Sequence, residues 1–274
     1  MKPAILIRLS ALFLALYTYT TAIRVLLAPI IHLPALPGGV QGQLLLLLLF
    51  SLTHALYLLG WRQTLAFFLL SAVISWGFEE LGVLTGSIYG NYYYTDMLGP
   101  KLGEVPILIP LAWFMMIYPS FIIANLIAEG KAIVHDSALS TIIRLSLLSA
   151  MVMTAWDLLI DPVLSGPDYH AWIWVDGGPY YGVPAQNYGG WILTTFTIYF
   201  CFRLFERTFP PSERNNVTTA IIAMPLVAYA SVMISNSFGS NVEGLQVIGP
   251  FVMGIPLMIA IFRLLKNHRR PYGH

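Results

Sequence analysis

The chain has 274 residues, of which 57% are hydrophobic and 10% are charged, and its net charge is +1. Soluble domains usually carry about 25% charged residues, so the composition excludes an ordinary soluble domain and predicts an integral membrane protein. The small net charge gives no reason to expect a nucleic-acid partner. The single cysteine, Cys201, excludes an internal disulfide.

Eight apolar segments are long enough to cross a bilayer, since a spanning helix needs roughly 20 mostly apolar residues. In chain order they cover about residues 5–28, 41–59, 63–84, 106–128, 138–160, 187–206, 216–236 and 245–265. The first is too long for the apolar region of a signal peptide, so we expect it to be a span. The sequence therefore predicts an all-α, polytopic bundle of about eight transmembrane helices, forming one domain over residues 1–274.

Lysine and arginine divide unequally between the two sides of such a bundle. If the N-terminus is cytoplasmic and the spans alternate, only Arg24 and Lys101 lie outside. The remaining twelve lie inside: Lys2, Arg8, Arg62, Lys131, Arg144, Arg203, Arg207, Arg214, Arg263, Lys266, Arg269 and Arg270. Cytoplasmic loops carry the excess of positive charge, so we expect a multi-pass protein of the cell membrane with both termini in the cytoplasm.

Two outer connections differ from ordinary hydrophilic loops because Gly, Pro, Tyr and Trp dominate them. They read TGSIYGNYYYTDMLGPKLGEVP (residues 85–106) and DPVLSGPDYHAWIWVDGGPYYGVPAQNYGGW (residues 161–191). An interfacial aromatic belt is one interpretation, because Tyr and Trp favour the headgroup level. The interleaved glycines and prolines favour a second interpretation, in which the loops fold back over the bundle as a lid with an aromatic inner surface.

Four carboxyl side chains lie near the outer ends of two spans. Glu79 and Glu80 end the third span, and adjacent helical residues point about 100° apart, so at most one can face a given partner. Asp157 and Asp161 are four residues apart and share one helix face. Pro162 disfavours helical geometry at the preceding residue, so we expect this helix to end at Asp161.

These four residues are the candidate catalytic groups. Intramembrane acids are costly and usually mark a function that faces the bundle interior, although snorkelling to the headgroups is the structural alternative. We expect the deeper Asp157 to hold its proton and act as an acid, with Glu79 or Glu80 as its partner. The shallower Asp161 would be ionised and activate water, because acid and base are separated by environment. No metal, nucleotide or nucleophile motif is present, so no metal and no cofactor are expected.

The middle of the chain resembles the membrane-bound carotenoid hydratases, a family that includes bisanhydrobacterioruberin hydratase and γ-carotene 1′-hydroxylase. The matching stretches are EELGVLTGSIYGNYYY, VPILIPLAWFMM, TAWDLLIDP and WIWVDGGPYYGVPAQNYGGW. The resemblance implies cofactor-free addition of water to a terminal double bond of an acyclic carotenoid end group, of the lycopene, γ-carotene or bisanhydrobacterioruberin type. The substrate would come from the lipid phase, and contact with other enzymes of the pathway is left open.

Hydration of this kind passes through a tertiary carbocation, and aromatic faces can stabilise a desolvated cation by about 2 kcal/mol. Asn187 could orient the water. The candidate substrate-binding residues are Trp76, Tyr89, Asn91, Tyr92, Tyr94, Trp113, Trp156, Trp174, Tyr181, Asn187 and Trp191.

Three alternatives stay open. An end-group cyclase begins with the same protonation and differs only in the access of water. A membrane prenyltransferase would hold Mg²⁺ at Asp157 and Asp161, but the sequence has no second Asp-rich motif and no group of Lys or Arg near these aspartates to bind a diphosphate. A non-enzymatic isoprenoid binder or a transporter fits intramembrane acids, but the matched halves of a transporter are not evident.

Overall fold

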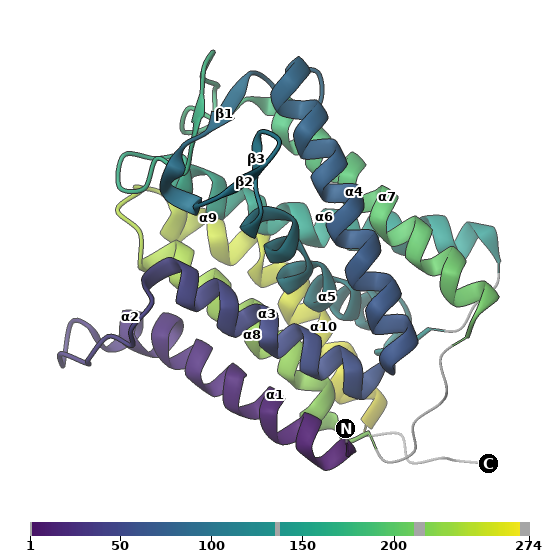
Figure 1. Ribbon diagram of the computed structural model, residues 1–274. Helices are drawn as coiled ribbons and strands as arrows, with labels where there is room; N and C mark the ends of the chain where they lie inside the picture. The colour runs from purple at the N-terminus through teal and green to yellow at the C-terminus, as the bar shows by residue number, and fades with distance from the viewer. Residues whose placement is uncertain (1, 135–137, 211–216, 269–274) are drawn as a thin grey trace, which may run out of the picture.

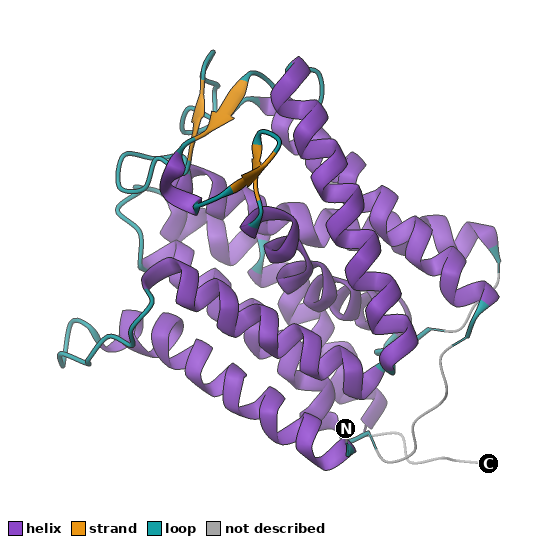
Figure 2. Cartoon of the chain, viewed as in Figure 1, coloured by secondary structure: helices purple, strands orange, loops and turns teal. Residues whose placement is uncertain are grey.

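The computed structural model describes residues 2–134, 138–210 and 217–268, and helices make up most of it (Figures 1 and 2). The helices are α1 (Pro3–Thr18), η1 (Tyr19–Ile23), α2 (Arg24–Leu27), α3 (Gly39–Leu58), α4 (Trp61–Thr85), η2 (Asp96–Leu98), α5 (Leu108–Glu129), α6 (Leu139–Leu164), α7 (Ala185–Thr208), α8 (Thr219–Phe238), α9 (Leu245–Val252) and α10 (Gly254–His268). The strands are β1 (Tyr92–Tyr94), β2 (Lys101–Leu102), β3 (Val105–Pro106) and β4 (Trp172–Trp174). The predicted all-α class is confirmed.

Seven segments of the described chain are long and apolar enough to cross a membrane. They are Pro3–Leu27, Gly39–Leu58, Trp61–Thr85, Leu108–Glu129, Leu139–Leu164, Thr219–Phe238 and Leu245–Asn267. The remaining predicted span, residues 187–206, corresponds to helix α7. This helix has 24 residues, which is long enough to cross a membrane, but it begins with the polar run Ala-Gln-Asn-Tyr-Gly-Gly. It packs against α6 and α4. The chain is therefore a multi-pass membrane protein, and α7 is the helix whose polar beginning enters the bundle.

Helix α5 is the centre of the bundle, and nearly every residue from Pro110 to Leu126 is buried. Pro119 lies inside it and frees the carbonyl of Met115, because proline has no N–H to donate four residues back. The Ser51 hydroxyl of α3 donates to that carbonyl at 2.8 Å. The neighbouring helix thus satisfies the freed backbone group, as membrane helices with internal proline require.

Helix α6 does not end at Asp161, so that prediction is wrong. The helix continues to Leu164 with Pro162 inside its last turn. Proline at this position frees the Leu158 carbonyl, and the Tyr180 hydroxyl donates to it at 2.9 Å. A donor from the loop after β4 therefore replaces the lost helical hydrogen bond and lets the helix carry Asp161 a full turn before its end.

The two aromatic loops meet as a small antiparallel sheet. Strand β1 pairs with β4, with Tyr92 opposite Trp174 and Tyr94 opposite Trp172. Side chains alternate across a strand, so these four rings share the face toward the bundle, while Tyr93 between them is 51% exposed. Strands β2 and β3 form a second short pair beside it. We call this part of the bundle the strand end.

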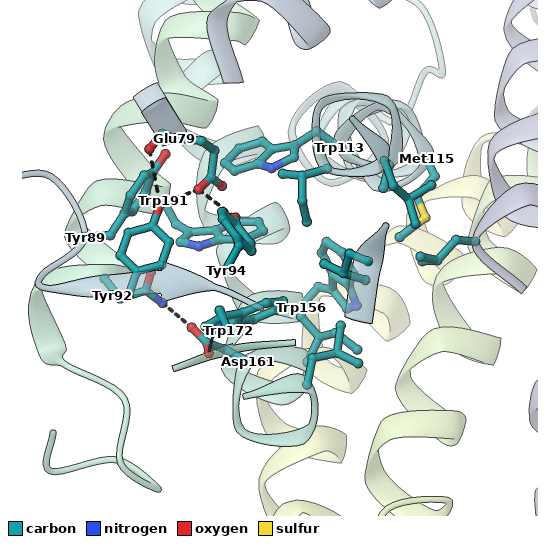
Figure 3. Close-up of a pocket in the computed structure, with 18 of the residues that line it drawn as sticks. Glu79, Tyr89, Tyr92, Tyr94, Trp113, Met115, Trp156, Asp161, Trp172 and Trp191 are labelled. Carbon is teal, nitrogen blue, oxygen red and sulfur yellow. Dashed lines mark hydrogen bonds between the residues drawn. The ribbon is translucent and has the colours of Figure 1, made fainter. Parts of the chain in front are cut away.

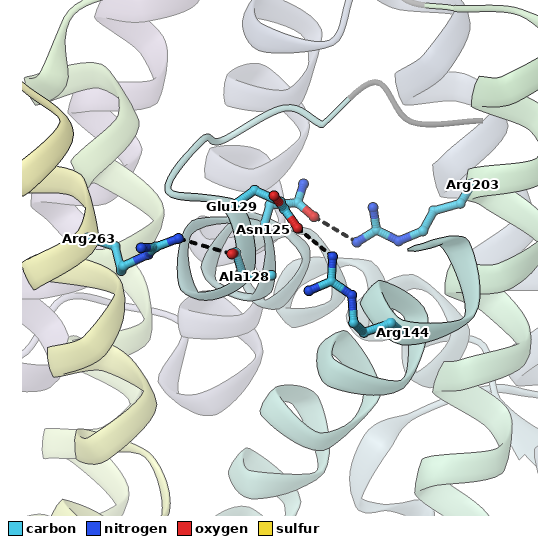
Figure 4. A network of polar contacts seen from close by, with 6 residues as sticks. All are labelled: Asn125, Ala128, Glu129, Arg144, Arg203 and Arg263. Atoms are coloured by element: carbon cyan, nitrogen blue, oxygen red, sulfur yellow. Dashed lines mark hydrogen bonds and ion pairs between the residues drawn. The ribbon is translucent and has the colours of Figure 1, made fainter. Parts of the chain in front are cut away.

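At the opposite end of the bundle α1 begins and α10 ends (Figure 1), and most of the described lysines and arginines belong to the helix ends that meet there. There, three arginines from different helices contact the last turn of α5 (Figure 4). These contacts are Arg144 to Glu129, Arg203 to Asn125 and Arg263 to the Ala128 carbonyl. Cations near a helix C-terminus are stabilised by its dipole. Arg214, Arg269 and Arg270 lie outside the described residues, and the cytoplasmic orientation of this end stays a prediction.

Candidate active site

A cavity of about 80 Å³ lies under β1 and β4, between α4, α5, α6 and α7 (Figure 3). Its walls are mostly aromatic and aliphatic, and two carboxyl side chains, Glu79 and Asp161, reach it. The predicted substrate-binding residues that line it are Tyr89, Tyr92, Tyr94, Trp113, Trp156, Trp174, Asn187 and Trp191. The two aromatic loops thus cover one cavity, as expected for a lid. Two of the four predicted acids, Glu79 and Asp161, reach that same cavity.

Glu79 enters the cavity from α4 and is 5% exposed. Its Oε2 accepts hydrogen bonds from the Tyr92 hydroxyl at 2.5 Å and the Tyr94 hydroxyl at 2.8 Å. Burial raises the pKa of both tyrosines well above the usual value of 10.0, so both hydroxyls stay protonated and donate. Trp113 lies beside the carboxyl (Figure 3). The two tyrosines therefore fix Oε2 and leave Oε1 free of them.

Asp161 enters the cavity from α6, and its two carboxyl oxygens accept hydrogen bonds from three N–H donors. Its Oδ1 receives the indole N–H of Trp172 at 2.9 Å and of Trp174 at 3.0 Å. Its Oδ2 receives the Asn187 amide at 2.7 Å. An N–H group can donate but not accept, so all three partners hold the carboxylate oxygens as acceptors. Indole and amide N–H groups therefore make the close contacts to Asp161, whereas two phenol O–H groups make the close contacts to Glu79.

Asp157 lies one turn below Asp161 and is fully buried. Its Oδ2 accepts the same Asn187 amide nitrogen at 2.8 Å, whereas no described residue donates a hydrogen bond to its Oδ1. It does not line the cavity. One amide from α7 therefore bridges two carboxyls of α6, and Asp157 reaches the cavity only through Asn187.

Glu80 points away from the cavity, as its neighbour Glu79 points in. Its Oε2 accepts the backbone N–H of Glu104 at 2.9 Å, in the turn between β2 and β3. Three predicted substrate-binding residues also lie elsewhere, each in a hydrogen bond. Trp76 donates to the Leu102 carbonyl, Asn91 to Asp176 and Tyr181 to the Glu243 carbonyl. These four residues brace the loops around the cavity.

Sequence reasoning missed Trp172, which donates to Asp161 and lines the cavity. The alternation Trp-Ile-Trp over residues 172–174 is the signal that could have found it, because it places Trp172 and Trp174 on one face of a strand. The aliphatic wall, which includes Leu44, Met115 and Ile160, was also missed. No pattern in their apolar surroundings distinguishes these three residues.

The donor set disfavours a metal at the two aspartates. Within residues 2–134, 138–210 and 217–268, no group of three or more His, Cys, Asp or Glu side chains is placed to hold a metal ion. The Asn187 amide and two indoles aim N–H groups at Asp157 and Asp161. A magnesium ion would need those oxygens as ligands, so the geometry does not fit the prenyltransferase alternative.

Comparison with known proteins matches most of the chain to one family model. The model, described as carotenoid biosynthesis protein, covers residues 40–262. The bisanhydrobacterioruberin hydratase of Haloarcula japonica is 36% identical over 121 residues, which are 44% of this chain and 38% of that relative. The chain thus matches less than half the length of this relative. No solved structure matches the chain.

Proposed function

The chain belongs to the carotenoid biosynthesis protein family, and we propose that it adds water to the terminal carbon–carbon double bond of an acyclic carotenoid end group. The observation that supports this is the small aromatic cavity with two carboxyls in unlike environments. Hydration of an isolated alkene needs a proton donor, a cation-stabilising wall and a proton acceptor for water. The hydratase relative supports the same chemistry.

In the proposed reaction, Glu79 is the general acid. The proton on Oε1, the oxygen that Tyr92 and Tyr94 do not contact, passes to the less substituted alkene carbon, and the electron pair of the double bond forms the new C–H bond. The other carbon becomes a tertiary cation. A water oxygen then bonds to that carbon, and Asp161 takes the proton that the water releases. The sum is alkene plus water giving a tertiary alcohol, and a proton returns from Asp161 to Glu79 through solvent.

The cavity walls suit the cation. Trp113 and Trp191 stack with ring centroids 4.4 Å apart, and Trp156 meets Trp191 edge-on at 5.8 Å. Aromatic faces stabilise a desolvated cation by about 2 kcal/mol, and the same rings displace bulk water that would otherwise capture it. A buried water needs roughly 10–15 Å³, so a cavity of about 80 Å³ has room for only a few groups of that size. This room suits one end group of a carotenoid rather than its whole polyene.

We assign Asn187 and Asp157 as positioning residues. The Asn187 amide donates to Oδ2 of Asp161 and fixes its position. The same amide nitrogen donates to Oδ2 of Asp157, which holds the amide in place from the side away from the cavity. This arrangement resembles a base held by a second group, which keeps the reacting oxygen in one orientation. Asp157 was predicted as the principal acid. Its position behind Asn187 favours Glu79 for that role.

The function is tested by expressing the chain in a bacterial host that accumulates acyclic carotenoids and by determining the masses of the extracted pigments. Hydration adds the mass of one water for each reacted end. A product of unchanged mass with altered absorbance would identify an end-group cyclase and overturn the proposal. The Glu80→Gln variant should form the same hydrated product as the wild type, because Glu80 lies outside the cavity.

A further inference from the structure

A second cavity of about 200 Å³ lies next to the first, between α1, α3, α6 and α8. Its character is different, because amide, hydroxyl and carboxyl groups of Gln43, Asp168, Ser235 and Asn241 face it together with apolar side chains. Asn241 donates to Asp168 at 3.0 Å on its border. We call it the polar cavity, and the first one the acid cavity.

The two cavities share part of their walls. Trp156, Ile160 and Leu164 line both, and their spacing of four residues places them on one stripe of α6. Leu44 of α3 and Met115 of α5 complete the shared wall. The same five side chains therefore separate a polar space from the aromatic space that contains the carboxyls.

We propose that the polar cavity supplies the water that the reaction consumes, and that the shared wall admits it to the acid cavity. This inference rests on the proposed function. A cavity of about 200 Å³ holds several waters at roughly 10–15 Å³ each, and its polar groups can give each water the two to four partners it needs.

The wall has the properties of a gate. It is apolar, so it does not hold water by itself, and a methionine side chain such as Met115 changes shape easily because it is unbranched. Ile160 occupies the middle of the α6 stripe. A wall of this kind keeps the acid cavity dry until the end group is bound, and then lets water reach the cation. The wall therefore determines whether the cation is captured by water or loses a proton.

The first test changes the wall at Ile160. In the Ile160→Phe variant the added ring narrows the passage, whereas Ile160→Ala widens it. Purified variants are given an acyclic carotenoid after equilibration in D₂O, and the tertiary alcohol is compared with alkene that has gained deuterium or moved its double bond. We expect the Ile160→Phe variant to form less alcohol while it still incorporates deuterium into the alkene. We expect the Ile160→Ala variant to form the same or a larger share of alcohol. Leu98→Phe is the control, because Leu98 lines only the acid cavity and should lower both products together.

The second test first measures the access of water to the polar cavity directly, by thiol labelling, and then the effect of the label on the products. In a Cys201→Ser background, Ser235→Cys places a thiol at the polar cavity, and Ser237→Cys places one on a buried face against Gly249. A charged, membrane-impermeant thiol reagent should modify the first and spare the second. Modification at position 235 should then lower alcohol formation more than alkene exchange.

The outcomes separate the two proposals. A wild-type protein that forms no alcohol overturns the proposed function and, with it, this inference. A wild-type protein that hydrates, while Ile160→Phe keeps the wild-type ratio of alcohol to exchanged alkene, overturns the inference alone. If Ile160→Phe does not fold, the labelling test decides. A thiol at position 235 that reacts no faster than the thiol at position 237 shows that water does not reach the polar cavity, and this result also overturns the inference.

Discussion

Replacing Glu79 by glutamine should abolish most of the hydration and leave the fold intact. Tyr92 and Tyr94 both donate to Oε2 of Glu79, and the carbonyl oxygen of a glutamine can accept both hydrogen bonds. The amide nitrogen then takes the place of Oε1, where the acid proton is proposed to reside. The substitution therefore removes the transferable proton while it keeps shape, volume and the bonds that hold β1 to α4.

The expected loss follows from the role. General acid–base groups contribute typically about 10²- to 10⁴-fold in rate, which corresponds to roughly 3 to 5 kcal/mol of transition-state free energy at 1.36 kcal/mol per tenfold. The assay is the initial rate of alcohol formation by purified protein in detergent, with thermal unfolding of the same samples as a check on the fold.

Glu80→Gln is the matched control for this experiment. It makes the same chemical change one residue along the chain, but Glu80 accepts the Glu104 backbone N–H outside the cavity. Its rate should stay close to wild type. A Glu79→Gln protein that folds and hydrates at the wild-type rate, or two variants that lose activity equally, would refute the assignment of Glu79 as the acid.

Four further predictions follow from the structure. Gly190→Ala puts a Cβ 2.6 Å from the Ile88 carbonyl oxygen and should lower both stability and hydration, whereas Gly189→Ala meets nothing within 4 Å and should be tolerated; thermal unfolding and rate measure both. Tyr180→Phe leaves the Leu158 carbonyl without its donor, so unfolding should become easier by about 1–3 kcal/mol, seen as a lower Tm in detergent. Exhaustive chelation should leave the hydration rate unchanged; a loss that Mg²⁺ restores would contradict this. Reporter fusions at positions 38 and 240 should read as outside the cell, and a cytoplasmic reading at either would contradict the predicted orientation.

The helices could be predicted from the sequence because apolar length alone specifies a spanning segment. The same segments placed the four carboxyls near the ends of two helices. The angle of about 100° between adjacent helical residues correctly implied that Glu79 and Glu80 point in different directions. Which of the two faces the interior depends on how α4 packs against α5 and α7, and no local pattern determines that.

The sheet over the site could not be predicted, because β1 and β4 are about 80 residues apart in the chain and each is only three residues long. Such pairing depends on the bundle that brings the two loops together. The helical course through Pro162 escaped prediction for a related reason. Its compensating donor, Tyr180, comes from a loop whose path follows from the tertiary structure.

The most direct test of the central claim is the origin of the product oxygen. Purified protein is incubated with an acyclic carotenoid in H₂¹⁸O under ordinary oxygen, and the product is analysed by mass spectrometry. The account predicts a tertiary hydroxyl that carries ¹⁸O from water, formed at the same rate when oxygen is excluded. A hydroxyl without the label, or product formation that stops when oxygen is removed, would contradict hydration by Glu79 and Asp161.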